Sequence, residues 1–488
     1  MPFVVRAFRE DASGAHFAAH NVTIPQPAVS FLVASFYVEN FGCRAAQADG
    51  AAIEQQFREL GLDRSKSPHQ AAIVVLNTCT VTASADQDAR SAVRRVHREN
   101  PDCQIVVTGC YAQRAPEEIA ALPGVSLVVG NSHKHRLAQI ALGERVPGSL
   151  SDSPLVTISS LLDPPNKLFV SDIFAHTEFL AIPVFDAANE RTRPNLKVQD
   201  GCDNRCSFCV IPYVRGQSRS SPLDGVLREV NVLVNSGYRE VVISGINLGR
   251  WGRDLTPNAT GVVLRFEHLV RAILTQTSLE KLRISSVEPM DWSDELISIV
   301  AASPRIAKHA HVPMQSGSDR VLRLMHRKYR PWHYREKIGK IHAAMPTAAI
   351  GADVMTGFPG ETDADFEETR LMIATLPLTY LHVFTYSPRP GTPAAAIRDQ
   401  VPIQIARERT RILRESGEEK KLAFMRSLIG KQLEAITLNS HSGDKADFTE
   451  ALTDNFLKLR LVGRHEVNRW IRVRVEQIDG GLLLGAAA

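Results

Sequence analysis

The 488-residue sequence lacks any run of apolar residues that approaches the roughly 20 needed to cross a bilayer. The apolar stretch from Ala28 to Phe36 is too short, and no cleavage-site pattern follows it, so a secretory signal is not expected. A strong excess of charge is also missing, and a net charge of +4 does not by itself indicate a nucleic-acid binder. These absences predict a cytoplasmic protein, in which structural disulfides are rare. The seven cysteines therefore need another explanation.

Strand and helix patterns alternate in two parts of the chain, residues 30–140 and 194–400. In the first part we expect helices at 44–60 and 83–99 and strands at 30–38, 71–76, 104–108 and 125–129. In the second part we expect strands at 195–199, 240–244, 281–285, 308–312, 348–354 and 380–385. Such alternation predicts parallel sheets covered by helices. The expected fold class is α/β, with a doubly wound parallel sheet in the amino-terminal domain and a central partial (β/α)6 barrel.

The remaining segments follow other patterns. Residues 1–29 show no clear period and are expected to form a poorly ordered extension, whereas the Pro- and Ser-rich residues 141–193 are expected to be a linker. A charged amphipathic stretch within 401–430 predicts a connecting helix. Short alternating segments after it predict a small all-β barrel over 431–488.

Three cysteines lie just after the expected strand 195–199, in the spacing Cys202-x3-Cys206-x2-Cys209, and we call them the loop triad. Three thiolates on one loop can bind three corners of a cubane iron–sulfur cluster, which leaves one iron open for a cofactor. A structural zinc site would need a fourth ligand, and no further Cys or His lies nearby. A buried core run is the other alternative, but the residues between these cysteines are mostly polar.

Three other cysteines, Cys43, Cys79 and Cys110, each come just after an expected strand, and we call them the sheet-edge triad. The carboxyl ends of parallel strands meet at one edge of a sheet, so these thiols can converge there on a single ion or cluster. The alternative is that they are small buried residues at strand ends. The seventh cysteine, Cys103, precedes its strand and is expected at the opposite edge, without a metal.

The loop LKVQDGCDNRCSFC, with the aromatic Phe208 before its third cysteine, resembles the cluster loop of radical S-adenosylmethionine (SAM) enzymes. The segments FGCRAAQAD, LNTCTVTASADQDAR and VTGCYAQRAPEE resemble the amino-terminal domain of tRNA methylthiotransferases in that superfamily, although RAAQAD is less polar than the usual pattern. The resemblance covers residues 31–485 and includes the three-domain order of this family. It implies two [4Fe–4S] clusters, an auxiliary one on the sheet-edge triad and one on the loop triad that binds SAM.

Four further segments resemble the core of this family: VISGINLGRWG, RISSVEPMDW, HVPMQSGSDRVLRLMHRKY and GADVMTGFPGET. All begin on or just after an expected strand, so their side chains face the carboxyl-terminal mouth of the barrel, where such folds place active sites. Polar residues at strand ends are also common as helix caps and turn formers. No catalytic residue is expected beyond the cluster ligands. We interpret the following residues as SAM-binding: Phe208, Ser244, Gly245, Asn247, Glu288, Gln315 and Asp353.

Basic residues mark two expected contacts with the substrate. Arg215 and Arg219 follow the loop triad and would hold a carboxylate or phosphate, unless they belong to a solvated basic loop. Near the carboxyl terminus, strand alternation places Arg472 and Arg474 on one face, where they would attract a phosphate backbone. Trp470 is expected to fill the small core rather than stack on a base. The segment LTDNFLKLRL resembles the TRAM module, a small β-barrel appended to RNA-modifying enzymes.

The segments RTRPNLKVQDGCDNRCSFCVIPYVRG and SGINLG most resemble the branch that converts N6-threonylcarbamoyladenosine at position 37, in the tRNA anticodon loop, to its 2-methylthio derivative. The resemblance implies that one SAM supplies the methyl group and another the radical that abstracts hydrogen from adenine C2. It also implies an electron donor such as flavodoxin or ferredoxin, and a sulfur source. This choice of substrate rests on likeness around the loop triad, not on a derived pocket.

Three alternatives remain for the function. The first is a sister enzyme that acts on isopentenyladenosine in tRNA or on a ribosomal-protein aspartate. The second is a radical SAM protein whose amino-terminal cluster only transfers electrons. The third is an RNA-binding protein that contains structural metal and has no catalytic activity.

Overall fold

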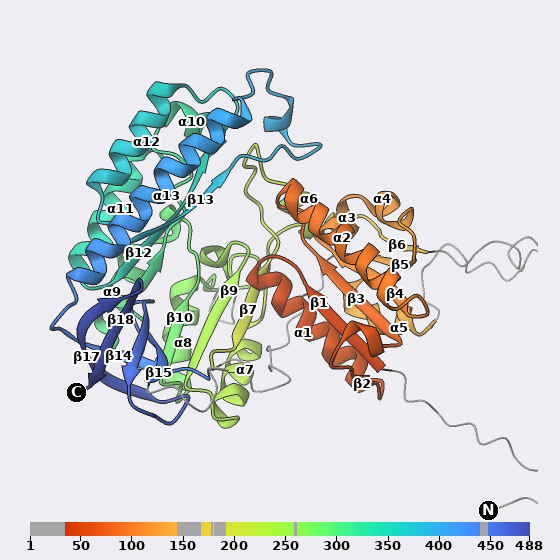
Figure 1. Ribbon diagram of the computed structural model, residues 1–488, viewed down its shortest axis with the longest axis horizontal. Coiled ribbons are helices and arrows are strands. Elements are labelled where there is room, and N and C mark those ends of the chain that lie inside the picture. The colour runs from red at the N-terminus through yellow and green to blue at the C-terminus, as the bar shows by residue number, and fades with distance from the viewer. Residues whose placement is uncertain (1–34, 144–166, 177–178, 180–191, 258–260, 440–447) are drawn as a thin grey trace, which may run out of the picture. The chain divides into compact units, whose positions relative to one another are not determined.

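The structure is a computed structural model that describes residues 35–143, 167–176, 179, 192–257, 261–439 and 448–488 (Figure 1). The predicted extension, 1–29, lies outside the described residues, and so does most of the predicted linker. Two parallel β/α regions and a closed β-barrel follow one another along the chain, as the sequence predicts.

The amino-terminal region is a six-stranded parallel sheet in the order β2-β1-β3-β4-β5-β6. Its strands are β1 (Ser35–Asn40), β2 (Asp63–Arg64), β3 (Ile73–Thr78), β4 (Gln104–Gly109), β5 (Val125–Gly130) and β6 (Leu168–Phe169). Every residue of β3 is buried because helices cover both faces of the sheet. Strand β6 lies within the predicted linker, so part of that segment extends the sheet.

Two groups of helices cover the faces of this sheet (Figure 1). On one face lie α1 (Arg44–Glu59) and α5 (Leu137–Ala141), and on the other lie α2 (Ala83–Glu99), α3 (Cys110–Arg114) and α4 (Pro116–Ala120). The Thr82 side chain caps the amino terminus of α2 by accepting a hydrogen bond from the Ala85 N–H at 3.1 Å. The predicted helix 83–99 is confirmed.

The central region contains six parallel strands in chain order, with one short antiparallel strand at the edge. The strands are β7 (Asn195–Asp200), β8 (Arg219–Ser220), β9 (Glu240–Gly245), β10 (Lys281–Ile284), β11 (His309–His311), β12 (Ala349–Thr356) and β13 (Tyr380–Thr385). A parallel bridge from Leu282 to Ile306 links the β8-β7-β9-β10 sheet to the segment that leads into β11-β12-β13. The predicted partial barrel is confirmed.

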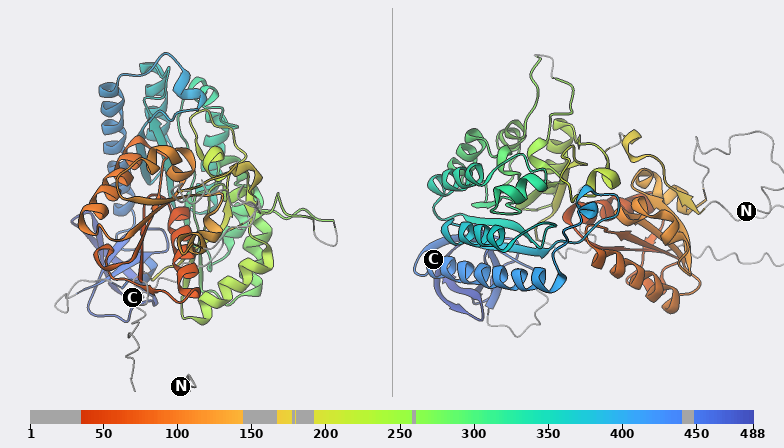
Figure 2. Two further views of the ribbon diagram at one scale, coloured as in Figure 1. Left: turned by 90° about the vertical axis from the view of Figure 1, so that its right-hand side faces the viewer. Right: turned by 90° about the horizontal axis from the view of Figure 1, so that it is seen from above.

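Helices pack on the outer side of these strands and form the largest core of the chain (Figure 2). They are α7 (Leu223–Asn235), α8 (Phe266–Gln276), α9 (Asp294–Ala302), α10 (Asp319–Leu324), α11 (Pro331–Ala344) and α12 (Asp363–Thr375). Short helix α6 (Ile211–Arg215) follows the loop triad. The long helix α13 (Ile403–Arg426) packs along β13 and leads to the carboxyl-terminal barrel.

The carboxyl-terminal barrel closes in the order β14-β15-β16-β18-β17. Its strands are β14 (Gln432–Thr437), β15 (Phe448–Thr453), β16 (Lys458–Val462), β17 (Trp470–Asp479) and β18 (Leu482–Ala487). The prediction that Trp470 fills the small core is wrong. Trp470 is only half-buried, and its ring lies 4.8 Å from the ammonium of Lys281 on β10, at the border with the central region.

Polar contacts hold the barrel to the central strands. The Arg283 guanidinium on β10 pairs with the Glu240 carboxylate at 2.6 Å and donates hydrogen bonds to the carbonyls of Thr453 and Asp454 in the barrel. Lys281 adds an ion pair with Glu434 on β14 at 2.6 Å. Arg283 and Glu240 are almost fully buried, with exposed side-chain fractions of 1% and 0%. A buried charge pair of this kind is costly to break from one side.

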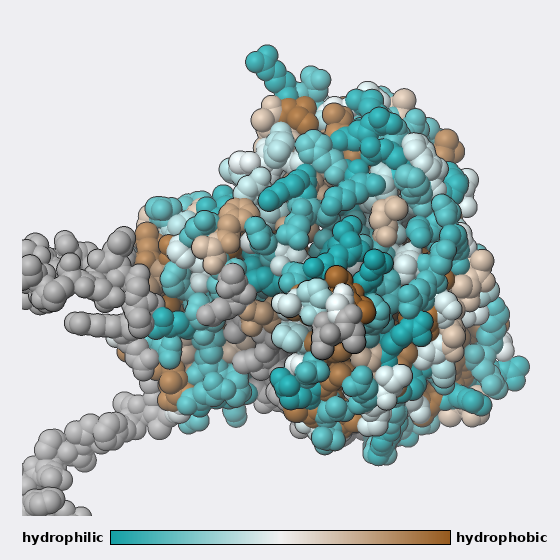
Figure 3. Space-filling view, turned by 180° about the vertical axis from the view of Figure 1, so that it is seen from behind, coloured by the Kyte–Doolittle hydropathy of each residue, from teal (hydrophilic) through white to brown (hydrophobic). Residues whose placement is uncertain are grey.

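Within the described residues, every helix is too short or too polar to pass through a lipid bilayer. The face in Figure 3 is mainly hydrophilic, and apolar residues appear there in small groups.

We expect Arg283→Met to reduce the free energy of unfolding by about 3 kcal/mol, because it leaves the buried Glu240 carboxylate with only Arg193, 3.5 Å away, and removes two hydrogen bonds to the barrel. Urea unfolding would measure the loss, and limited proteolysis would show earlier cleavage between α13 and β14. The control is Arg271→Met, whose pair with Glu295 is exposed and should contribute less than about 1 kcal/mol. Equal small losses in both variants would contradict the role given to Arg283.

Candidate active site

The sheet-edge triad gathers at the carboxyl ends of three neighbouring strands. Cys43 follows β1 and precedes α1, Cys79 follows β3, and Cys110 begins α3 directly after β4. The three thiols lie close enough to influence one another electrostatically. Burial, followed by the nearby Cys110 and Cys43, raises the pKa of the Cys79 thiol to about 11. The structure thus brings together the three cysteines that the strand-end argument selected.

Gly42 lets Cys43 and Cys79 approach each other. Its backbone has φ +97°, and a Cβ at this position would lie only 2.7 Å from Cβ and 2.9 Å from Sγ of Cys79. Only glycine adopts this backbone at little cost and leaves that space free. Cys103 lies at the start of β4, away from these strand ends and inside the apolar core, as predicted.

The loop triad lies between β7 and α6, and polar groups surround its sulfurs. The Asn204 backbone N–H and the Asn247 amide donate to Cys202 Sγ at 3.4 and 3.6 Å, and Arg327 donates to Cys206 Sγ at 3.2 Å. Burial is the main cause that raises the pKa of Cys202 to about 11 and that of Cys209 to about 12. Such thiols ionise readily only when a cation binds them, which is the behaviour of metal ligands.

One cavity of about 650 Å³ touches both triads. Cys43 represents the sheet-edge triad in its wall, and all three cysteines of the loop triad line it. Cys110 packs against Val210 and Ile211, which directly follow Cys209. This member of the sheet-edge triad therefore lies just behind the same wall. The cavity is also lined by all seven residues predicted to bind SAM, namely Phe208, Ser244, Gly245, Asn247, Glu288, Gln315 and Asp353.

Three of these residues each have a buried side-chain oxygen without a hydrogen-bond partner among the described residues. These atoms are Ser244 Oγ, Asn247 Oδ1 and Gln315 Oε1. Gln315 also has a positive φ of 63°, a backbone conformation that is costly for a residue with a side chain. Buried polar atoms are nearly always paired in native proteins, so these atoms fit a polar cofactor in the cavity.

Arg327 is a residue of this site that the sequence did not single out. Its guanidinium pairs with the Glu288 carboxylate and donates to Cys206 Sγ. The ring of Tyr329 lies 4.9 Å from the same guanidinium. Arg327 lies within the segment HVPMQSGSDRVLRLMHRKY, but nothing in the spacing of that segment indicates that this arginine, rather than its neighbours, reaches the loop triad.

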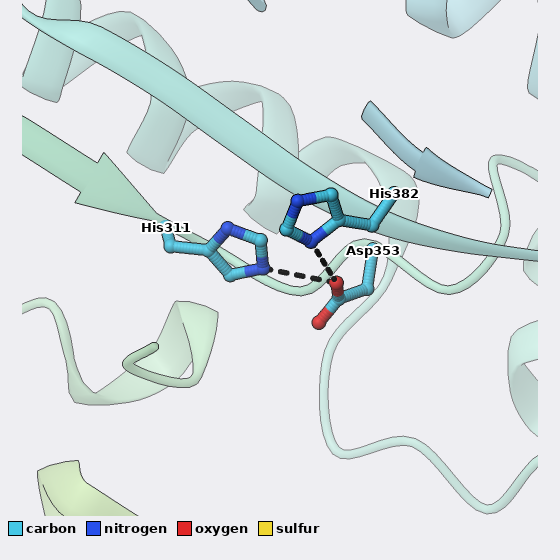
Figure 4. A group of neighbouring side chains, drawn as sticks. All are labelled: His311, Asp353 and His382. Atoms are coloured by element: carbon cyan, nitrogen blue, oxygen red, sulfur yellow. Dashed lines mark ion pairs between the residues drawn. The ribbon is translucent and has the colours of Figure 1, made fainter. Parts of the chain in front are cut away.

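A second group, of which the sequence indicated only Asp353, also lines the cavity. On β11, β12 and β13, the side chains of His311, Asp353 and His382 point toward one another (Figure 4). Asp353 Oδ1 lies 3.0 Å from His311 Nε2 and 3.4 Å from His382 Nδ1. Burial opposes ionisation of Asp353, but hydrogen bonds from the two histidines outweigh it and hold its pKa below the ordinary value.

Buried ion pairs join the amino-terminal region to the central strands, and we call the five residues involved the ionic lock. Asp49 on α1 contacts Lys134 at 2.9 Å, Lys197 at 2.5 Å and Arg215 at 2.9 Å. Asp200 at the end of β7 accepts from both Lys197 and Arg215 at 2.9 Å. The five side chains are at most 10% exposed.

The position of Arg215 does not fit its predicted contact with a substrate carboxylate or phosphate. Its guanidinium is 2% exposed and is committed to Asp49 and Asp200. Arg219 is partly buried, with Nη1 directed at the carbonyls of Gln217 and His176. Arg472 and Arg474 are exposed and alternate with the buried Val473 on β17, so they share the outer face of the barrel as predicted.

The ionic lock keeps its carboxyl groups charged. Burial opposes ionisation of Asp49 and Asp200, but the surrounding cations outweigh it and hold the pKa of each carboxyl below its ordinary value. The only sequence sign of this lock is the run Asn195–Asp200, in which polar residues alternate through a strand expected to be buried on both faces.

A second buried contact reinforces the join between the two regions. Arg389, which follows β13, pairs with Asp86 on α2 at 2.7 Å and donates to the Thr80 carbonyl. Asp86 also binds Arg114 of α3 at 2.9 Å. Thr80 and Asp86 closely follow Cys79, and Arg114 closely follows Cys110. This contact therefore also constrains the sheet-edge triad.

A loop triad at the carboxyl ends of a partial β/α barrel, together with a cavity that offers unpaired polar atoms, defines a radical SAM enzyme, here with a second cysteine site in a preceding sheet. Family models agree, because residues 196–373 match the radical SAM superfamily and residues 35–130 match the uncharacterized protein family UPF0004. The chain belongs to the radical SAM tRNA methylthiotransferase family. Membership implies a [4Fe–4S] cluster and SAM as cofactors.

Similar proteins cover nearly the whole chain. The threonylcarbamoyladenosine tRNA methylthiotransferase MtaB of Aquifex aeolicus (strain VF5) is 35% identical over 90% of this chain and 99% of its own length. MtaB of Bacillus subtilis (strain 168) is 34% identical over 91% and 94%. The tRNA-2-methylthio-N(6)-dimethylallyladenosine synthase of Novosphingobium aromaticivorans is 32% identical over 82% of this chain and 86% of its own.

Among solved structures, the radical SAM methyltransferase TsrM of Kitasatospora setae, with cobalamin and a [4Fe–4S] cluster bound, has a TM-score of 0.52. The match covers 74% of this chain and 76% of TsrM at 13% identity, so it shows a shared fold.

We expect Asp49→Ala to reduce the free energy of unfolding by about 3–5 kcal/mol at pH 7, because three buried cations would then face Asp200 alone. Since folding lowers the Asp49 pKa, its contribution is complete above the ordinary value of 3.8 and is lost as the pH falls below it. The difference between wild type and variant should therefore shrink only under acid conditions. Urea unfolding of cluster-free protein from pH 7 to pH 3 measures it.

The matched control is Asp102→Ala, an exposed aspartate just before β4. It should change stability by no more than about 0.5 kcal/mol. A loss at Asp49 that stays constant through pH 3, or one no larger than the loss at Asp102, would contradict the role of the ionic lock.

Proposed function

We propose that this protein transfers a methylthio group to C2 of N6-threonylcarbamoyladenosine at position 37 of tRNA. The observation that carries the proposal is the cavity, because it touches both cysteine triads. The protein is also 35% identical to an MtaB enzyme over 90% of this chain. A reaction that combines sulfur with a SAM-derived radical needs both groups beside the same substrate atom. The two triads on one cavity meet this need.

The two triads are suited to hold one [4Fe–4S] cluster each. The loop triad, Cys202, Cys206 and Cys209, would hold the cluster that binds SAM, and the sheet-edge triad, Cys43, Cys79 and Cys110, would hold the auxiliary cluster. When bound, these groups supply the radical and the transferable sulfur of the family's chemistry. Each triad leaves one cluster iron without a cysteine ligand, so a further molecule can reach it.

The SAM-binding part of the cavity is the strand-end wall beside the loop triad. Ser244, Asn247 and Gln315 offer unpaired polar atoms, and Gly245 lets the backbone approach closely. Phe208 packs edge-on against Phe358 and gives this wall an apolar surface. Glu288 is held in place there by Arg327. Asp353, the remaining residue predicted to bind SAM, is instead held by His311 and His382.

Protein groups do the orienting and shielding in this site. Arg327 fixes Glu288 and donates to Cys206 Sγ, so it sets the position of a carboxylate and adds positive charge beside the cluster ligand. The loop triad is only partly exposed, which limits the access of water to the place where a radical would form. The ionic lock and the Arg389 contact hold the two triads at a fixed separation.

The tRNA and the remaining partners follow from the same proposal. Arg472 and Arg474 on the barrel face would contact the phosphate backbone, and Arg219 near the loop triad would contact the substrate closer to the cavity. The reaction also needs an electron donor, such as flavodoxin or ferredoxin, and a source of sulfur.

We expect Cys206→Ala to abolish both SAM cleavage to 5′-deoxyadenosine and methylthio transfer, because the cluster on the loop triad would be lost. Cys79→Ala should abolish methylthio transfer but keep SAM cleavage, because it removes a ligand of the other cluster. Iron and sulfide content of anaerobically reconstituted protein should fall from about eight of each to about four in either variant. Product chromatography and metal analysis provide the measurements.

Cys103→Ala is the control, because Cys103 is buried away from both triads and should retain iron and activity. Unchanged iron content in Cys79→Ala would refute the auxiliary cluster. About one zinc per chain without sulfide would instead indicate a structural metal site.

The choice of substrate is tested by mass spectrometry of tRNA nucleosides from cells that lack the protein. We expect the 2-methylthio group to disappear from N6-threonylcarbamoyladenosine alone, and to return when the gene is restored. Loss of the same group from dimethylallyladenosine would instead assign this chain to the substrate named for the Novosphingobium relative.

A further inference from the structure

Imidazole and phenol rings form the end of the cavity that lies on β11 and β13, and we call His309, His311, Tyr380 and His382 the histidine wall. The Tyr380 hydroxyl lies 2.7 Å from His309 Nε2 and 2.9 Å from His311 Nδ1. His311 then contacts Asp353, which contacts His382 (Figure 4). One hydrogen-bonded chain therefore runs from the buried His309 to the exposed His382.

The chain of contacts leaves two polar atoms directed away from the wall. His382 uses Nδ1 toward Asp353, its side chain is 61% exposed, and Nε2 has no hydrogen-bond partner among the described residues. Asp353 uses the same oxygen, Oδ1, toward both histidines. Its Oδ2 has no hydrogen-bond partner among the residues that the structure describes. An imidazole nitrogen and a carboxylate oxygen, both able to accept a hydrogen bond, thus lie next to each other on the cavity surface.

The geometry of the substrate determines which part of it can reach this wall. The atom to be modified, C2 of the purine, must lie near the triads. C6 is separated from C2 by N1, and the exocyclic bond to N6 points away from C2. The N6 substituent therefore needs a wall of the cavity other than the one that faces C2, and the histidine wall is a polar lining of the same cavity that contains no cysteine of either triad.

We propose that the histidine wall receives the N6 substituent of the target adenosine, with His382 Nε2 accepting a hydrogen bond from the hydroxyl of its threonyl group, an inference that rests on the proposed function. A threonylcarbamoyl group carries hydroxyl and amide donors that can pair with this wall. A dimethylallyl group would bury the same imidazole and carboxylate atoms without partners, which binding sites built from polar groups reject strongly.

The residues of the histidine wall and the neighbouring Asp353 have separate roles in this arrangement. His382 is the specificity residue that touches the substrate. Asp353 positions it by holding Nδ1, and the Asp353 charge is met by two histidines rather than left facing the ligand. Tyr380 hydrogen-bonds both His309 and His311, and Phe456 from the barrel packs against His309 with the rings tilted by 31° and their centroids 4.5 Å apart. The wall is therefore preorganised before a substrate enters.

The test compares two substrates with the reconstituted full-length holoenzyme: a tRNA that carries N6-threonylcarbamoyladenosine at position 37, and the same tRNA with unmodified adenosine there. Initial rates of methylthio transfer at increasing tRNA concentration give kcat and KM for wild type, His382→Phe and His382→Gln. Phe keeps a planar ring but cannot hydrogen-bond, whereas Gln keeps an acceptor, its amide oxygen, at similar reach. His342→Phe, an exposed position on α11 outside the cavity, is the control.

We expect His382→Phe to raise KM for the threonylcarbamoylated tRNA about 10- to 100-fold. The ratio of its kcat/KM to that of unmodified tRNA, which is the advantage of the modified substrate, should fall by the same factor. His382→Gln should recover part of that advantage, and His342→Phe should match wild type. An unchanged ratio between the two tRNAs in His382→Phe, with or without a general loss of rate, would overturn the inference.

Two other outcomes are distinguishable from this one. Wild-type enzyme that forms 5′-deoxyadenosine but methylthiolates neither tRNA would refute the proposed function itself. A stoichiometric divalent metal other than iron in wild type, lost in His382→Phe, would show that His311, Asp353 and His382 bind a cation, and would overturn the inference that His382 contacts the substrate directly.

Discussion

The ionic lock between α1, β7 and α6 is the constraint on which the rest of the site depends. Four of its five charged groups, all but Lys134, lie within a few residues of a cysteine or on a strand that leads to one. Asp49 lies on the helix that starts after Cys43, Asp200 precedes Cys202, and Arg215 follows Cys209. Desolvating five charged groups is expensive, and apolar residues would often stabilise a fold as well or better. What the lock provides is a defined position of one triad relative to the other.

The topology explains why both triads reach one cavity. In a parallel sheet all carboxyl ends lie along one edge, and loops from several strands meet there. The amino-terminal sheet and the central barrel both present that edge to the cavity, which is why Cys43 and the loop triad line the same space. Residues that are far apart in sequence, such as Asp49 and Arg215 at a separation of 166 positions, become direct neighbours.

Features governed by local periodicity or by strand ends could be predicted from the sequence. The helix Ala83–Glu99 and the strand Tyr380–Thr385 have the predicted bounds, and the strand-end rule selected Cys43, Cys79 and Cys110. Features that depend on distant partners could not be predicted. Arg215 reads as a basic loop residue, and only the fold shows that two carboxylates enclose it. The histidines of β11 read as ordinary strand positions until β12 and β13 lie beside them.

Phe456 gives the carboxyl-terminal barrel an unexpected place in this enzyme. It belongs to the barrel, has a positive φ of 69°, and lines the cavity beside His309 and Tyr380. The module that resembles an RNA-docking appendage therefore also lines the cavity that touches both cysteine triads. Removing the barrel would weaken the contact with RNA. It would also open the cavity to solvent beside His309 and Tyr380, where a radical would need to be shielded from water.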